Sequence, residues 1–569
     1  MTSDINELAK MKEEQTPTDS FLYSRTPTDY SSYFLEDLKM SADYPAHLPR
    51  GKACVPCRRR KMKCDGNKPK CNQCLRFNRL EECEYNEVAV PSTARVLEQH
   101  IARLQSRIQE LEQDDPSLVK LHNPYNQAPS GPSQEWWEMP EPPPRVAQYL
   151  INQFIPHASK FGFFFHATRF VNAVFSPTVS KPRPPTVLRN AVYLWGISLS
   201  RDRQYTTREA LFLNRALTSI HAALSSAQPQ DTLHVLQAEI LLAYYFFHNG
   251  RLIEGKFHSS AAVSLAVMCS LHKQGSNGSE PTANQPSGHL AFNLPAPRDP
   301  IEEGERIHAW WTTFILDKCW VVALGSPSTI LEDDNNSNTR VDAPWPLDLD
   351  KYGTQPRTRN SHTLRAFIQD LMSSTGGPDP CLFAIHAKAA ALYERATRYA
   401  LLWEKNIGSH QAEFSALDSC IERFKQTLPS PERVNEEITH TLLIAHSLAH
   451  TATIQLHLRF VGQSSTSRSR CLTAANSVIR LTQVLPVRRL PCLNPIMAVL
   501  WTTASEVLSG GLKTLKSTRS AWASSSALPG EDVLLSALTQ VTDIAGSFSA
   551  GSPYMNIRLS EIRQYCANV

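Results

Sequence analysis

The chain has 569 residues and a formal net charge of +4, and 41% of its residues are hydrophobic. It is too long for one domain of roughly 100–200 residues, and no apolar run approaches the roughly 18 residues that a membrane span needs. The polar, charged N-terminus argues against a secretory signal peptide, so we expect a protein of a reducing compartment, with several domains and no membrane partner.

Residues 1–50 are predicted to be a disordered N-terminal segment. They are rich in Ser, Thr and Tyr and carry 9 acidic and 5 basic side chains. Within them, residues 29–40 alternate acidic side chains with aromatic and aliphatic ones. Such a composition is typical of segments that become ordered on a protein partner.

Six cysteines follow in residues 51–86, with the spacing C-x2-C-x6-C-x6-C-x2-C-x8-C and no histidine between them. Cysteine thiolates at such spacings are typical zinc ligands. The segment is also strongly positive, because residues 51–83 carry 10 basic and 3 acidic side chains. The predicted metal ligands are Cys54, Cys57, Cys64, Cys71, Cys74 and Cys83.

Six thiolates are too many for one tetrahedral zinc site and too few for two separate ones. Two zinc ions per chain are possible if two sulfurs are shared. The pseudo-repeat C-x2-C-x6-C and C-x2-C-x8-C suggests that the first cysteine of each half is the shared one. A single-zinc ribbon is the alternative, and it would use only Cys54, Cys57, Cys71 and Cys74.

Each C-x2-C pair is predicted to lead into a short helix. The first helix would span residues 55–63 and the second residues 72–80. The loop between them contains Gly66 and Pro69, which suit a tight reversal of the chain.

The block ACVPCRRRKMKCDGNKPKCNQCLRFNRLEECEY at 53–85 resembles the DNA-binding domain of fungal binuclear zinc-cluster transcription factors. The resemblance lies in the cysteine spacing, the basic run before the third cysteine and the loop proline. It implies that Cys54 and Cys71 bridge two zinc ions. It further implies that the sites are completed by two terminal pairs, Cys57 with Cys64 and Cys74 with Cys83.

The same resemblance implies that the first helix enters the major groove of double-stranded DNA, where Lys61 reads a CGG triplet beside Arg60. Basic side chains suit this role independently, since Lys and Arg donate to guanine O6 and N7 and further cations contact phosphates. The predicted DNA-contacting residues are Lys52, Arg58, Arg59, Arg60, Lys61 and Lys63. A module this small has little apolar core, so zinc binding should supply its folding energy.

Residues 87–115 are predicted to form a linker and a dimerisation helix. Apolar residues between Ala94 and Leu111 alternate steps of 3 and 4, with Ala or Ile at a positions and Leu at d positions. This pattern favours a short parallel two-stranded coiled coil, and a helix packed on its own domain is the alternative. We therefore expect a homodimer on paired CGG-like triplets, held by Leu97, Ile101, Leu104, Ile108 and Leu111.

Residues 116–144 are predicted to be a Pro-rich linker, and residues 145–569 a large all-α regulatory domain with almost no strand alternation. Three stretches, at 161–170, 250–273 and 299–330, resemble the middle homology (regulatory) domain of the same family. The predicted fold class of the whole chain is thus mostly α.

Single polar and aromatic residues of this region are expected to be structural. Trp310 and Trp311 should lie in the core, and Asp317 should pair with Arg306 or another cation. The histidines expected to be hydrogen-bonded structural residues are His166, His272 and His308.

No nucleophile elbow, P-loop, zinc-protease or dinucleotide motif occurs in the sequence, so an enzyme is not expected. We predict a nuclear, zinc-dependent, sequence-specific regulator of RNA polymerase II transcription, acting on a metabolic pathway with transcriptional coregulators. The alternative is an interaction or ligand-sensing protein whose zinc cluster is structural only.

Overall fold

The protein is described by a computed structural model over most of its length. The described residues are 52–85, 100–106, 135–179, 182–226, 231–274, 294–330, 340–354, 364–370, 381–403, 411–432, 436–521 and 530–568. Within these ranges every regular element is a helix and none is a strand, which confirms the predicted mostly α fold class. No helix in the same ranges has the length and apolar character needed to span a membrane. The chain divides into two compact units, Met1–Pro129 and Ser130–Val569.

The first unit contains two short helices, α1 (Val55–Arg59) and α2 (Asn72–Arg76). Both end earlier than predicted, because the chain turns into the left-handed region two residues beyond each helix. Lys61 has φ of 52° and Asn78 has φ of 51°. A residue in this conformation ends a helix, so the predicted helical spans 55–63 and 72–80 are wrong at their C-terminal ends.

The two helix ends repeat the same hydrogen bonds. The backbone N–H of Met62 donates to the Cys57 carbonyl over 2.9 Å, and that of Arg79 donates to the Cys74 carbonyl, also over 2.9 Å. These are the bonds of a Schellman motif, which satisfies carbonyls left open at a helix end. The pseudo-repeat in the sequence is therefore a structural repeat.

Residues 100–106 form a helical segment that belongs to the predicted coiled coil. Ile101 and Leu104 are 50% and 63% exposed there, and the other residues of this segment are exposed too. The other predicted coiled-coil positions, Ala94, Leu97, Ile108 and Leu111, lie outside the described residues, as does the predicted disordered segment 1–50.

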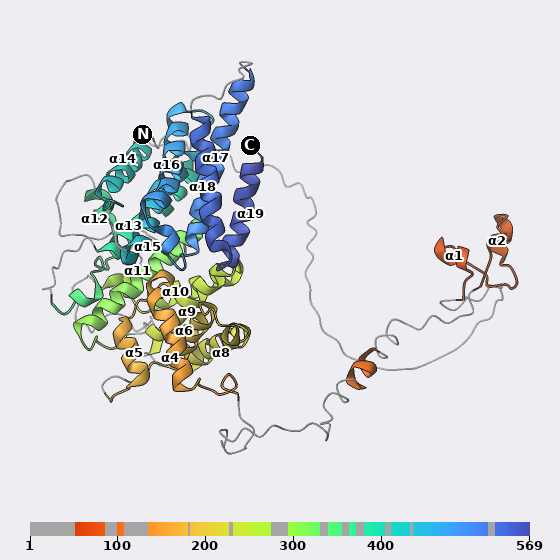
Figure 1. Cartoon of the computed structure of the whole chain (residues 1–569), viewed down its shortest axis with the longest axis horizontal. Coiled ribbons are helices and arrows are strands. Elements are labelled where there is room, and N and C mark those ends of the chain that lie inside the picture. The colour runs from red at the N-terminus through yellow and green to blue at the C-terminus, as the bar shows by residue number, and fades with distance from the viewer. Residues whose placement is uncertain are drawn as a thin grey trace, which may run out of the picture. The chain divides into compact units, whose positions relative to one another are not determined.

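The second unit begins with a group of helices around α6, which packs against α4, α8 and α9. These helices form one end of the unit, drawn in orange and yellow in Figure 1. Their bounds are α4 (Pro144–Phe154), α5 (Ala167–Phe175), α6 (Thr186–Ser198), α7 (Arg203–Thr206), α8 (Glu209–Ser226) and α9 (Thr232–His248).

Helix α11 joins this group to the remaining helices, because it contacts α9 and α10 on one side and α13 and α17 on the other. From α13 the packing continues through α15, α16 and α17 to α18 and α19, which form the teal-to-blue end in Figure 1. The bounds are α10 (Leu252–Met268), α11 (Pro300–Ala323), α12 (Leu364–Asp370), α13 (Leu382–Trp403), α14 (Gln411–Thr427), α15 (Glu436–His457), α16 (Ser465–Val484), α17 (Ile496–Ala521), α18 (Glu531–Ser549) and α19 (Pro553–Ala567). Short 3-10 helices lie at Ile155–Phe161, Leu271–Lys273, Leu349–Lys351, Leu458–Phe460 and Val487–Arg489.

Large aromatic side chains fill the core of this unit. Trp310 and Trp311 are fully buried on α11, which confirms their predicted core position. On the same helix Trp320 stacks on Phe247 of α9, with ring centroids 3.5 Å apart. Such contacts between sequence-distant helices make α11 the central helix of the packing.

The packed unit starts before residue 145, which corrects the predicted extent of the Pro-rich linker. Trp136 lies against Tyr205 with ring centroids 5.5 Å apart, and the Arg208 guanidinium lies 3.6 Å from the ring of Trp137. Both tryptophans are half-buried against the core. The two aromatic side chains explain why the end of the predicted linker belongs to the helical unit.

Asp317 is buried and pairs with a cation, but not with Arg306. It accepts a 2.6 Å hydrogen bond from the Ser328 hydroxyl and lies 3.6 Å from the Lys256 ammonium. Arg306 instead pairs with Glu302 one turn earlier on α11. Of the two predicted possibilities, Arg306 or another cation, the structure shows the second, with Lys256 as the cation.

The histidines expected to be structural are held by neighbours. His166 accepts from the backbone N–H of Arg169, and His308 donates to the Leu347 carbonyl over 2.7 Å. Burial lowers the pKa of His308 to about 4, so this side chain is neutral at pH 7. His272 is buried beside Trp310.

Candidate metal centre and DNA-binding surface

The first unit gathers its six cysteine sulfurs at the centre of the module. Five of the cysteines are buried, and Cys64 is half-buried against them. The sulfurs fall into two groups of four, and within each group all atoms lie within 4.8 Å of one another. One group holds Cys54, Cys57, Cys64 and Cys71, and the other holds Cys54, Cys71, Cys74 and Cys83.

Cys54 and Cys71 belong to both groups, and their sulfurs lie 3.6 Å apart. A tetrahedral zinc ion with Zn–S bonds of about 2.3 Å places its sulfurs about 3.8 Å from each other. Four further sulfur pairs that lie within one group are 3.7–3.9 Å apart, which matches this spacing. The sulfurs of Cys57 and Cys74, which belong to different groups, are also 3.9 Å apart. The residues present therefore fit two tetrahedral sites with two sulfurs in common.

The local sequence places these sulfurs at the starts of the two helices. Cys54 is the N-cap of α1, and Pro56 occupies the first turn, where a missing N–H costs no hydrogen bond. Cys71 is the N-cap of α2, and its sulfur accepts a 3.3 Å hydrogen bond from the backbone N–H of Cys74. Burial raises the pKa of the Cys71 thiol to about 12, so a metal ion that binds there displaces a proton.

Two side chains outside the cysteine pattern form further contacts within the module. The carboxylate of Asp65 accepts from the backbone N–H of Asn72 over 3.0 Å, which caps α2 from the preceding loop. The Tyr85 hydroxyl donates to the Asn67 carbonyl over 2.9 Å. We did not predict these contacts, although an Asp before Gly66 and a Tyr two residues after the last cysteine were signals in the sequence.

The predicted DNA-contacting cations are all exposed. Arg58 and Arg59 lie on α1, Arg60 is its C-cap, and Lys61 and Lys63 follow in the turn that ends the helix. Lys52 is also exposed, two residues before the first cysteine. Of these six, Arg60 forms a surface ion pair with Glu82, with an N–O distance of 3.4 Å.

The two halves of the module differ in the chemistry of their surfaces. Positions 58 and 60 carry arginines, whereas the corresponding positions of the second half carry Leu75 and Phe77, which are 56% and 55% exposed. The basic run is thus confined to the half built on α1. A nucleic acid attracted by this charge would meet α1 and the turn after it.

Comparisons with known proteins match both units. Residues 52–90 match the fungal Zn(2)-Cys(6) binuclear cluster domain, and residues 151–379 match the fungal specific transcription factor domain. Over 34 residues, 6% of this chain and 5% of the relative, the chain is 62% identical to an uncharacterized transcriptional regulatory protein of Saccharomyces cerevisiae.

Two other relatives align with most of the chain. A citrinin biosynthesis transcriptional activator of Monascus purpureus is 22% identical over 80% of this chain and 86% of its own length. Its counterpart in Monascus ruber is 22% identical over 76% of this chain and 92% of its own length. No solved structure matches the chain significantly.

Proposed function

Because the chain belongs to the fungal binuclear zinc-cluster transcription factors, we propose that it acts as a homodimer that reads paired CGG-like triplets and controls a metabolic pathway. Its general function is that of a DNA-binding transcription regulator with a zinc-binding cysteine cluster. We further propose that the chain binds two zinc ions, contacts DNA through its basic segment, forms a homodimer and acts in the nucleus.

Two zinc ions per chain are supported by the sulfur geometry. Cys54 and Cys71 would bridge the ions, and each remaining pair of cysteines would complete one tetrahedron, Cys57 with Cys64 and Cys74 with Cys83. The bound metal fixes the relative positions of α1 and α2, because the module has almost no other buried apolar side chain among its described residues. This geometry is the observation that carries the proposal.

The basic segment then provides the DNA contacts. We assign base reading to Lys61, because the left-handed turn at this residue lies at the exposed end of α1. Arg58, Arg59 and Lys63 supply contacts with phosphates or neighbouring bases, and Lys52 supplies a further phosphate contact. Arg60 is exposed beside Lys61 and forms an ion pair with Glu82.

Dimerisation is assigned to the helix that includes residues 100–106. The exposure of Ile101 and Leu104 supports it, since large apolar side chains at heptad a and d positions are buried when two helices pair. The helical unit would modulate this DNA-binding dimer, with transcriptional coregulators as partners. The two Monascus relatives are named as activators of a biosynthetic pathway, which supports control of a metabolic pathway.

Selection of random double-stranded oligonucleotides with the purified zinc-loaded chain tests the proposal. We expect enrichment of paired CGG-like triplets and binding that weakens steeply with salt, because several cations replace counterions at phosphates. A cluster with a structural role only would enrich no sequence and would show no salt dependence. That result would favour an interaction or ligand-sensing protein instead.

A further inference from the structure

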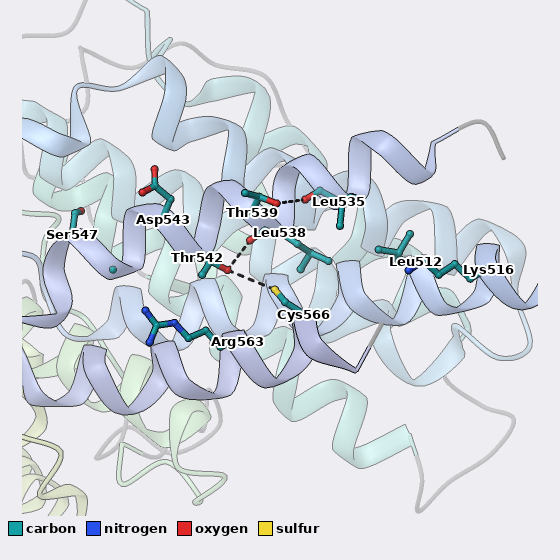
Figure 2. Close-up of a pocket in the computed structure, with 11 residues that line it drawn as sticks. Leu512, Lys516, Leu535, Leu538, Thr539, Thr542, Asp543, Ser547, Arg563 and Cys566 are labelled. Atoms are coloured by element: carbon teal, nitrogen blue, oxygen red, sulfur yellow. Dashed lines mark hydrogen bonds between the residues drawn. The ribbon is translucent and has the colours of Figure 1, made fainter. Parts of the chain in front are cut away.

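A pocket of about 570 Å³ lies between α17, α18 and α19. It belongs to the second compact unit, whereas the cysteine cluster belongs to the first. Figure 2 shows the residues that line it, with Leu512 and Lys516 of α17 to one side of those on α18 and α19. Its size falls within the roughly 300–1,000 Å³ of typical small-molecule sites.

The lining of the pocket is apolar over much of its surface. Leu512 of α17 and Leu538 of α18 are almost fully buried at its base. Leu535 also lines it and is 54% exposed. An apolar ligand in the pocket would remove this side chain from water.

A glycine near the C-terminal end of α18 widens the pocket. Gly546 lines it, and a Cβ added at this position would meet no atom within 4 Å among the described residues. A helix-interior glycine costs roughly 0.5–1 kcal/mol relative to alanine, and here no close packing requires it. The missing side chain therefore contributes space rather than a helix contact.

The charged groups around the pocket are mainly positive. Lys516 and Arg563 line it at opposite ends, and the pair formed by Thr542 and Cys566 lies between them, with an O–S distance of 3.6 Å. Asp543 also lines the pocket, but its carboxylate is ion-paired with Arg488. Arg563 has no hydrogen bond or ion pair with any described residue.

We infer that this pocket binds a small organic anion with an apolar body, such as a medium-chain carboxylate. The apolar part lies on Leu512, Leu535 and Leu538, beside the space left by Gly546. The carboxylate pairs with the Arg563 guanidinium, whose planar fork suits bidentate binding of a carboxylate. A role of this ligand as the effector of the regulator rests on the proposed function, whereas the binding itself does not.

Binding of octanoate to the purified zinc-loaded chain tests the inference, with octanol and octylammonium as probes of the same length. We expect octanoate to bind by calorimetry at least tenfold more tightly than octylammonium. Arg563→Gln should weaken octanoate about tenfold and leave octanol unchanged. Equal binding of the three probes, or an Arg563→Gln variant with wild-type octanoate affinity, overturns the assignment.

A pocket-filling variant separates this site from other surfaces. Gly546→Leu should abolish octanoate binding, whereas Gly510→Leu should not, because Gly510 also faces open space in α17 but does not line the pocket. Octanoate should also protect Cys566, and not Cys381, from alkylation measured on peptides. Retained octanoate binding in Gly546→Leu overturns the inference.

The DNA-binding proposal is tested separately from this one. Gly546→Leu should bind CGG-containing DNA like the wild-type chain, because the substitution lies in the helical unit. A chain that binds DNA but no octanoate contradicts the pocket assignment alone. A chain that binds octanoate but no DNA contradicts the proposed function alone.

Discussion

The sulfurs of Cys54 and Cys71 lie 3.6 Å apart, and both belong to each of the two four-sulfur groups in the first unit. Each of these cysteines is the N-cap of one helix. Because both cysteines belong to both groups, α1 and α2 each contribute a ligand to both metal positions. Loss of either cysteine should therefore affect both metal positions at once.

Cys54→Ala should remove both zinc ions and abolish sequence-specific DNA binding. Cys57→Ala should retain one zinc ion per chain, because Cys54, Cys71, Cys74 and Cys83 still form a complete group. Metal analysis of purified variants checks this, with Cys269→Ala as a control because that cysteine is buried in the helical unit. Equal zinc loss in Cys54→Ala and Cys57→Ala would argue against shared sulfurs.

Lys61→Asn should leave the module folded and remove its preference for CGG. Asn78 occupies the corresponding position of the second half with almost the same φ, so asparagine is compatible with the left-handed turn. We expect a loss of about 1–3 kcal/mol in discrimination against other triplets, measured by competition band shifts. Wild-type preference in a zinc-replete Lys61→Asn chain would contradict the base-reading role.

Lys52→Ala should affect DNA binding differently from Lys61→Asn, because Lys52 is an exposed cation to which we assign a phosphate contact and no base contact. Binding should weaken by a similar factor for every DNA sequence, and the slope of log affinity against log salt should fall by about 1. A change in sequence preference in this variant would show that the division between base and phosphate contacts is wrong.

Asp65→Ala should destabilise the zinc module by about 1 kcal/mol, the usual cost of losing a cap on a helix N-terminus. The carboxylate accepts from the N–H of Asn72 at the start of α2. Competition with a zinc chelator measures the destabilisation, because the Asp65→Ala chain should lose its zinc at a lower chelator concentration than the wild-type chain. Glu81→Ala is the control, because Glu81 is exposed and caps neither helix. Unchanged retention in Asp65→Ala would exclude the capping role.

Leu104→Lys should convert the dimer into a monomer, because a charge at a d position cannot be buried in a two-stranded coiled coil. Arg103→Lys, a neighbouring exposed position in the same helical segment, should leave the dimer intact. Light scattering coupled to gel filtration measures the mass. A monomeric wild-type chain, or a dimeric Leu104→Lys variant, would contradict this assignment.

Asp299 should stabilise the helical unit in a pH-dependent way. Its carboxylate caps α11 and binds the Arg169 guanidinium, and this pairing lowers its pKa from 3.8 to about 2. Because the folded pKa is depressed, the stabilisation is present above about pH 4 and is lost as the pH falls toward 2.

Asp299→Asn, which retains a capping side chain, should therefore lower unfolding stability by a constant amount between pH 5 and 7. The difference from wild type should shrink below pH 4. Urea unfolding followed by circular dichroism measures it, with the exposed Asp532→Asn as control. A difference that is the same at pH 3 and pH 7 would rule out the charge pairing as its cause.

The pseudo-repeat in the cysteine spacing suggested that Cys54 and Cys71 are shared, whereas the assignment of the other four cysteines to two groups came from the family resemblance. The helix lengths were not predictable in the same way. Asn78 is a residue type that favours the left-handed conformation, but the matching position of the first half is Lys61, whose residue type does not mark such a turn.

In the helical unit, periodicity predicted the elements and the buried positions of Trp310 and Trp311. The partners of polar residues depended on contacts distant in sequence. Lys256 reaches Asp317 from another helix, and the tryptophans before residue 145 pack on side chains about 70 residues later. Local patterns carry no information about such pairs.

The zinc content of the purified wild-type chain tests the central claim most directly. Six cysteines that share two sulfurs predict two zinc ions per chain, measured by elemental analysis against protein concentration. One ion per chain would support the single-site ribbon instead. A chain without zinc that still binds CGG-containing DNA would contradict the whole account.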